Sequence, residues 1–146
     1  MNFYRLISTL AAIVLPLGAL MAQTQAPPTP QDQEKQLQEF IDKEVQRLSS
    51  QLKLEYWQEF YVDSTLTHDL HARKEELELL RDTKVENSDL YLLVSDRWME
   101  KIDSAYMRFF TEEQWSKYMK NGGAKAKRER DKRKEKERKA SAGLKK

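Results

Sequence analysis

The chain contains no cysteine, and its 146 residues include only four glycines and four prolines. Without cysteine the protein can form no disulfide, has no thiol nucleophile and cannot build a cysteine-ligated zinc site. So few glycines leave no glycine-rich phosphate loop and no glycine-flanked serine nucleophile. The acidic residues are abundant but spread along the chain. We therefore predict that the protein is not an enzyme and needs no cofactor.

Strict alternation of apolar and polar residues, which is typical of half-buried β-strands, is also lacking. Apolar residues instead recur every three or four positions, which predicts an all-α fold. We expect three longer amphipathic helices plus a short helix, arranged as an elongated hairpin or cradle. The apolar positions that define the three longer helices are Leu37, Ile41, Val45, Leu48 and Leu52; Val62, Leu66, Leu70, Leu77 and Leu80; and Tyr91, Val94, Trp98, Ile102, Ala105 and Phe109.

Local signals place the ends of these helices. Thr29 and Pro30 form a typical helix start, with Thr29 as N-cap and Pro30 at the first helical position. Asn87 or Ser88 can cap the third helix. The weak helix formers at 63–67 predict a kink or short break in the second helix, because their short polar side chains compete for backbone hydrogen bonds.

The first 22 residues have the features of a secretory signal peptide. One positive charge, Arg5, precedes an apolar run from Leu10 to Met21, which is too short to span a membrane. Residues 23–30 contain three prolines and read as a linker. These features predict a periplasmic or secreted protein.

Charge divides the rest of the chain into two parts. Residues 23–123 carry 13 Lys or Arg and 20 Asp or Glu, whereas residues 124–146 carry 12 basic and 4 acidic residues. We expect a helical domain over 31–123 and a basic tail over 124–146, helical or disordered. The candidate partners of the basic tail are anionic lipid, anionic polysaccharide, acidic proteins and the acidic body of a second copy. The tail has no aromatic side chain for base stacking, so we predict no nucleic-acid binding.

The segment from Phe110 to Gln114 predicts a helix junction. The Thr111 hydroxyl and the Gln114 side chain can form a capping box that starts the short helix. A weaker version lies 56 residues earlier, from Leu54 to Gln58, with Glu55 in the capping position. A capping box is also a general way to begin a helix and needs no functional explanation.

Together, these two apolar-x-x-x-Gln segments resemble the motifs of the LTxxQ family, the small periplasmic helical proteins of the Spy and CpxP type. The second segment keeps threonine and glutamine with Phe110 in place of leucine, and the first keeps Leu54 and Gln58. The resemblance covers about 51–120. It implies an elongated helical dimer shaped like a cradle that acts as an ATP-independent holding chaperone or an envelope-stress adaptor.

Aromatic residues are the best candidates for contacts with partly unfolded protein clients or with a second copy; they include Trp57, Phe60, Trp98, Phe109 and Trp115. The alternative is an ordinary core or dimer seam. A domain of roughly 90 residues buries only about 60–65% of its unfolded surface. We therefore expect a homodimer in either case.

Two further functions remain open from the sequence. The tail can dock a structural envelope protein on an anionic surface, and deletion of residues 124–146 would separate this function from that of a chaperone. His68 and His71 lie one helical turn apart, with Glu75 one turn beyond, so they can form a weak metal site of a metal-responsive sensor. The simpler interpretation of the histidines is that both are exposed polar residues.

Overall fold

The computed structural model describes residues 29–143. The predicted signal peptide, most of the predicted linker and residues 144–146 lie outside this range. The described chain is helical with no strand, so the all-α prediction is confirmed. Its helices are α1 (Pro30–Leu52), α2 (Tyr56–Asp82), α3 (Ser88–Phe109), α4 (Glu112–Tyr118) and α5 (Ala124–Gly143). None of them is long and apolar enough to be a candidate membrane span.

Side-chain caps fix the first turns of the helices. The Thr29 hydroxyl accepts from the Asp32 amide at 3.2 Å, and Asp32 accepts in return from the Thr29 amide at 3.0 Å. Asn87 Oδ1 accepts from the Asp89 amide at 3.0 Å. The predicted starts of the first and third helices are therefore correct.

α2 runs without interruption through the segment where a kink was predicted, so that prediction is wrong. The buried side chains of Val62, Leu66 and Leu70 fall on one face and pack into the core. This packing outweighs the weak helix propensity of the residues between them, because tertiary contacts routinely override local preference.

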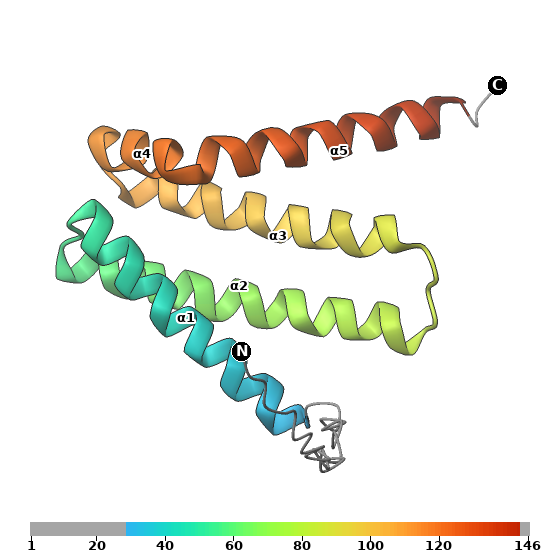
Figure 1. Cartoon of the computed structure of the whole chain (residues 1–146), viewed down its shortest axis with the longest axis horizontal. Coiled ribbons are helices and arrows are strands. Elements are labelled where there is room, and N and C mark those ends of the chain that lie inside the picture. Colours follow the sequence, from blue (N-terminus) through green and yellow to red (C-terminus); the bar gives the residue numbers. More distant parts are fainter. Residues whose placement is uncertain (1–28, 144–146) are drawn as a thin grey trace, which may run out of the picture.

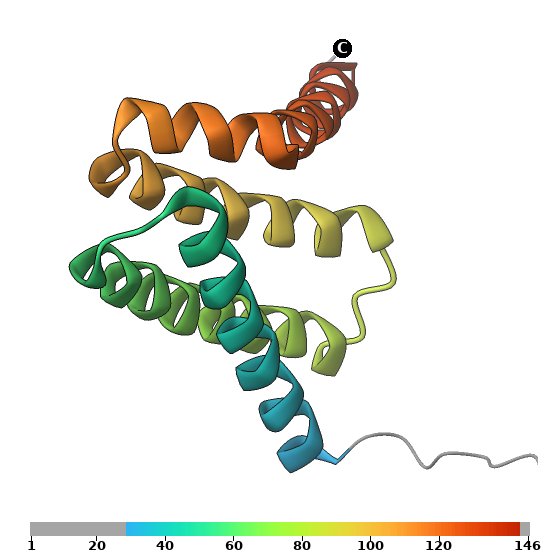
Figure 2. The ribbon, with the colours of Figure 1, turned by 60° about the vertical axis from the view of Figure 1, so that its left-hand side comes forward.

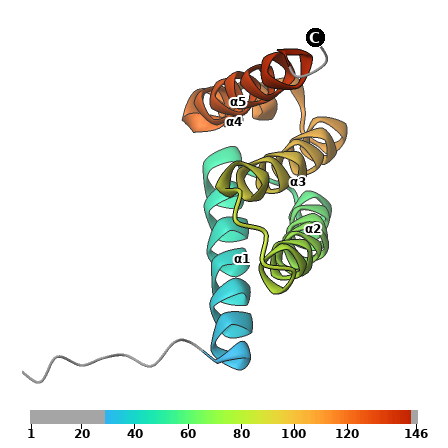
Figure 3. The same cartoon turned by 90° about the vertical axis from the view of Figure 1, so that its right-hand side faces the viewer.

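α2 and α3 form a hairpin, α1 crosses α2 diagonally, and α5 lies along α3 (Figures 1 and 3). The core lies where α1, α2, α3 and the start of α4 meet. Its buried members are Ile41, Leu48, Leu52, Val62, Leu66, Leu70, Ile102, Tyr106 and Phe110. Nearly all come from the apolar stripes that predicted the helices.

The chain bends between α4 and α5 at Met119–Gly123 (Figure 2). Asn121 and Gly122 leave the helical conformation, and Gly122 has φ of 121°, which favours glycine. This segment is therefore a turn between two helices. The tail that follows is helical as far as Gly143.

α5 packs against α3 through charged groups. Arg130 is its only buried residue and forms an ion pair with Asp103 of α3. Arg133 binds Asp96 with two hydrogen bonds of 2.6 and 2.8 Å, and Lys134 reaches Glu100 at 3.3 Å. The inner face of the basic tail thus binds acidic residues of its own chain.

Candidate functional site

The two predicted motif segments meet in space through their glutamines. Gln58 Nε2 donates to Gln114 Oε1 at 2.7 Å, and Gln114 Nε2 donates to Gln58 Oε1 at 3.0 Å. We call this pair and the two helix starts that it joins the glutamine junction. Gln58 is 2% exposed, and Gln114 is half-buried.

Each glutamine also binds the backbone on both sides of the junction. Gln58 Oε1 accepts from the Glu55 amide and Gln114 Oε1 from the Thr111 amide, both at 2.9 Å. Gln58 Nε2 donates to the Phe109 carbonyl at 2.7 Å, and Gln114 Nε2 donates to the Leu52 carbonyl at 3.5 Å. Each side chain therefore caps its own helix and contacts the end of the helix that precedes the other glutamine.

The second segment forms the complete capping box that the sequence predicted, since the Thr111 hydroxyl accepts from the Gln114 amide at 3.2 Å. At the first segment the Gln58 half of the box is present. The Glu55 carboxylate accepts from the Trp57 indole Nε1 at 2.7 Å. The aromatic side chain that follows is thereby tied to the helix start.

The two apolar motif positions point into the core. Phe110 is buried, and its ring stacks on Tyr106 with centroids 4.9 Å apart. Leu54 is half-buried and packs against the same core. The motif residues therefore join α1, α2, α3 and α4 at one end of the molecule.

Four aromatic side chains project from the first turns of α2 beside this junction: Tyr56, Trp57, Phe60 and Tyr61, which we call the aromatic surface. Their exposed fractions are 87%, 47%, 62% and 52%. Tyr61 contacts Trp57 and Phe60 edge-on and stacks on Phe109 of α3 at 5.9 Å. The contacts place exposed rings next to one another on a well-anchored helix start.

The remaining predicted contact residues lie deeper. Trp98 is half-buried, donates from Nε1 to Glu76 at 2.8 Å and has Lys101 Nζ 3.7 Å from its ring centre. Trp115 packs against the core and against Tyr118. Neither tryptophan belongs to the aromatic surface, whereas Phe109 connects that surface to the core.

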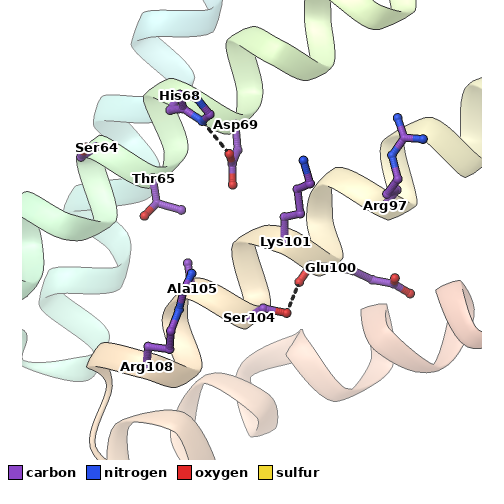
Figure 4. Close-up of a pocket in the computed structure, with 10 residues that line it drawn as sticks. All are labelled: Ser64, Thr65, His68, Asp69, Arg97, Glu100, Lys101, Ser104, Ala105 and Arg108. Atoms are coloured by element: carbon purple, nitrogen blue, oxygen red, sulfur yellow. Dashed lines mark hydrogen bonds and ion pairs between the residues drawn. The ribbon is translucent and has the colours of Figure 1, made fainter.

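The groove between α2 and α3 continues from the aromatic surface, and the sequence analysis missed it (Figure 4). It has a volume of about 590 Å³ and is lined by Ser64, Thr65, His68, Asp69, Arg97, Glu100, Lys101, Ser104, Ala105 and Arg108. Its three cations recur on α3 at steps of four and seven, which is the spacing of one helical face. That spacing could have revealed the groove.

The Glu76 carboxylate lies near this groove and accepts hydrogen bonds from one cation and one indole. Glu76 accepts from the Arg97 guanidinium and from Trp98 Nε1. These bonds hold the pKa of Glu76 below its ordinary value, with the Arg97 bond the larger cause. Arg108 has no ion-pair partner among residues 29–143.

The two histidines have separate neighbours. His68 Nδ1 lies 2.8 Å from Asp69 Oδ1, whereas His71 Nε2 faces Glu34 of α1 at 3.4 Å. Within the described part of the chain no group of three or more His, Cys, Asp or Glu could hold a metal ion. His68, His71 and Glu75 therefore form no common site here.

No protein-family model, curated protein or solved structure significantly matches this chain. The resemblance to the LTxxQ family therefore stays a prediction that rests on the two motif segments.

Proposed function

We propose that this protein is an exported, ATP-independent binding protein of the holding-chaperone or envelope-stress adaptor type. The aromatic surface is the observation that carries this proposal. Exposed aromatic side chains gathered at one place are typical of sites that bind other proteins. Binding there needs no nucleotide, because apolar contact is itself favourable in water.

The character of the surface suits varied clients. Tyr56, Trp57 and Tyr61 combine a large apolar body with a polar group at the edge, so they can contact apolar segments while remaining hydrated when empty. Apolar contact is non-directional and does not demand one client sequence. In the α2–α3 groove next to the surface, Arg108 has no ion-pair partner among residues 29–143 and favours clients that carry acidic residues beside apolar ones.

The glutamine junction has a positioning role in this proposal. It ties the first turn of α2 to the ends of α1 and α3, and the Glu55–Trp57 bond extends that support to one exposed ring. A pre-organised surface loses less conformational entropy on binding than a mobile one.

Aggregation of a chemically denatured client, followed by light scattering, tests the proposal. We expect the purified protein to suppress aggregation at stoichiometric amounts. The double variant Trp57→Ala and Phe60→Ala should lose most of this protection while keeping its helical circular dichroism. Leu79→Ala is the matched control, because Leu79 is exposed but lies at the other end of α2.

Equal protection by the double variant and the wild type would contradict the proposal. The same variants also separate client binding from self-association. If the double variant converts a dimer to a monomer in sedimentation experiments and protection is unchanged, the aromatic surface is a dimer seam.

A second candidate function is supported by the outer face of α5. Lys132 and Lys139 are mostly exposed on this face, and their ion pairs are with Glu129 and Glu135 of α5 itself rather than with α3. They can bind an anionic surface while Arg130 and Arg133 hold the helix to the body. The protein would then be a structural envelope-associated protein.

Deletion of residues 124–146 is a poor test of this second function, because it removes the partner of buried Asp103. The double variant Lys132→Glu and Lys139→Glu leaves that contact in place, because neither lysine pairs with α3. If tail docking is the function, the variant loses sedimentation with anionic vesicles at low salt and retains client protection. Unchanged sedimentation would rule the second function out.

A further inference from the structure

Arg73 is a partly buried cation that has no counter-charge among residues 29–143. It lies on α2, and its nearest polar contact is weak: one guanidinium nitrogen is 4.0 Å from Met99 Sδ of α3. Its Nε is buried and has no hydrogen-bond partner in the part of the chain that the structure describes. No carboxylate of residues 29–143 lies within ion-pair distance of it, and burial lowers the pKa of Arg73.

Such an arrangement is costly. A guanidinium stays protonated in proteins, so it cannot escape the cost of burial by losing its charge. Removal of a charge from water is offset only when an opposite charge or hydrogen-bond acceptors replace the lost hydration. Arg130 shows the usual solution in the same molecule, since its buried guanidinium pairs with Asp103.

Arg73 lines a groove between the N-terminal half of α1 and the C-terminal half of α2, where the two helices diverge (Figure 1). The groove has a volume of about 370 Å³, which lies within the range of small-molecule sites. Its apolar wall is made by Leu37, Leu70, Leu77 and Tyr91. We call it the Arg73 groove.

The charges around the groove are mainly positive. Lys74 and Arg81 join Arg73, and Glu78 is the only acidic residue in the lining. Lys74 is paired with Glu34 at 2.9 Å. Arg81 is mostly exposed and reaches Asp82 only at 3.9 Å, so it is available as a second contact for an anion.

We propose that the Arg73 groove binds an amphipathic anion, with one apolar chain against the half-buried Leu37 and Leu77 and a carboxylate or phosphate head at Arg73. The lining decides this class of ligand. A small inorganic anion would leave Leu37 and Leu77 in contact with water, and a neutral apolar molecule would supply no counter-charge to Arg73. A polyanion would find only two cations free to bind it.

Calorimetric titration of the purified protein with dodecanoate, below its micelle concentration, tests this proposal. We expect saturable binding at one site per chain. Arg73→Met, which keeps an unbranched side chain without the charge, should weaken binding at least tenfold. Lys127→Met is the matched control, because Lys127 is on the distant helix α5, and it should bind as the wild type does.

The two parts of the ligand can be tested separately. Acetate supplies the head without the chain and dodecanol the chain without the charge, so each should bind at least tenfold more weakly than dodecanoate. Binding of free dodecanoate assigns the site to a monomeric fatty acid, whereas binding only to phosphatidylglycerol vesicles, abolished in Arg73→Met, assigns it to a lipid head group. Equal binding of acetate and dodecanoate, or no binding to either probe, would overturn the proposal.

The melting temperature of Arg73→Met shows whether weaker binding results from a folding defect. Without ligand, Arg73→Met should melt at or above the temperature of the wild type, since an uncompensated charge is removed. Saturating dodecanoate should raise the melting temperature of the wild type alone. If Arg73→Met binds dodecanoate as tightly as the wild type, Arg73 does not hold the head group and the proposal fails.

Discussion

α1 and α5 both flank the α2–α3 hairpin, but they are held there by different chemistry. α1 buries Ile41, Leu48 and Leu52 in the core, with Ile41 fully inaccessible to water. α5 buries no apolar side chain and is held by Arg130, Arg133 and Lys134 to acidic groups of α3. One helix is therefore held by apolar burial and the other by charge.

The two kinds of contact differ in strength and in their response to salt. Burial of one large aliphatic side chain contributes about 1.5–3 kcal/mol and depends little on ionic strength. Apart from the buried Arg130–Asp103 pair, the ion pairs that hold α5 are at least partly exposed, and such a pair contributes about 0–1 kcal/mol and weakens as salt is added. We therefore expect α5 to separate from the body under conditions that leave α1 in place.

The largest effect should come from the apolar side of this comparison. Ile41→Ala leaves a cavity between α1 and α2 and should cost about 2–5 kcal/mol of unfolding free energy. Urea unfolding followed by circular dichroism measures this. The same loss should appear at low and at high salt, and a loss that depends strongly on salt would show that α1 is not held by apolar burial.

The second largest loss of unfolding free energy should come from the glutamine junction, because it connects the ends of α1 and α3. Gln58→Leu keeps the size of the side chain but leaves the Glu55 amide, the Phe109 carbonyl and Gln114 without their partner. Since unsatisfied buried groups cost about 1–3 kcal/mol each, we expect a total loss of about 2–4 kcal/mol.

A double-mutant cycle with Gln114→Leu checks whether the junction acts as a unit. The loss in the double variant should be smaller than the sum of the two single losses, by about 0.5–3 kcal/mol of coupling energy. Additive losses would mean that each glutamine acts only as the cap of its own helix.

A smaller effect is expected from the charged side. Asp103→Asn removes the carboxylate that pairs with Arg130 and accepts from Tyr118 at 2.7 Å. The expected loss is about 1–2 kcal/mol, since α5 can swing away and let Arg130 regain water. Amide hydrogen exchange should speed up in α5 and stay slow in α1; equal acceleration in both helices would contradict the comparison.

Alkaline pH should lower the free energy of unfolding through Tyr118, which lies at the end of α4. Burial, and then the Asp103 carboxylate, raise the pKa of Tyr118 above that of a free tyrosine. The folded state therefore holds this proton more tightly, so the stability contribution is complete below about pH 10 and falls as the pH rises above it. Tyr118→Phe should cost about 1 kcal/mol at neutral pH and lose less stability above pH 10.

Buried Tyr106 also makes the unfolding free energy fall at alkaline pH, because burial raises its pKa as well. The comparison is thus between slopes of unfolding free energy against pH in the wild type and in Tyr118→Phe. Identical slopes would show that Tyr118 does not contribute.

The smallest effect should come from a partly exposed contact of α5. Arg133→Ala removes the two hydrogen bonds to Asp96 and should cost about 0–1 kcal/mol at low salt and nothing measurable in 1 M salt. A salt-independent loss would indicate that the stem of Arg133 matters through packing.

Most of the helical framework was predictable from the sequence because it depends on short-range patterns. The stripes in α1, α2 and α3 mark the buried faces, and Thr29, Asn87 and Thr111 mark the starts by capping chemistry that acts within one turn. The predicted kink in α2 failed because Val62, Leu66 and Leu70 are buried in the core and local propensity is the weaker influence.

The contacts of charged groups were less predictable. Arg130 and Asp103 are 27 residues apart, and neither belongs to a periodic pattern that would single it out from other charges. The same holds for Arg73, which stands out only because no carboxylate of the described residues pairs with it. The sequence analysis recognised Gln58 and Gln114 as related, but their direct hydrogen bonds required the packing of four helix ends.

The glutamine junction also has a consequence for how this protein can change over evolution. Its two halves are encoded 56 residues apart but form a single polar contact in which each amide needs the other. A substitution at one glutamine removes the hydrogen bonds between the two side chains and leaves the opposite amide with its backbone contacts alone until a matching substitution follows. Among homologues, positions 58 and 114 should therefore vary together, and their correlated replacement would identify relatives better than either short motif alone.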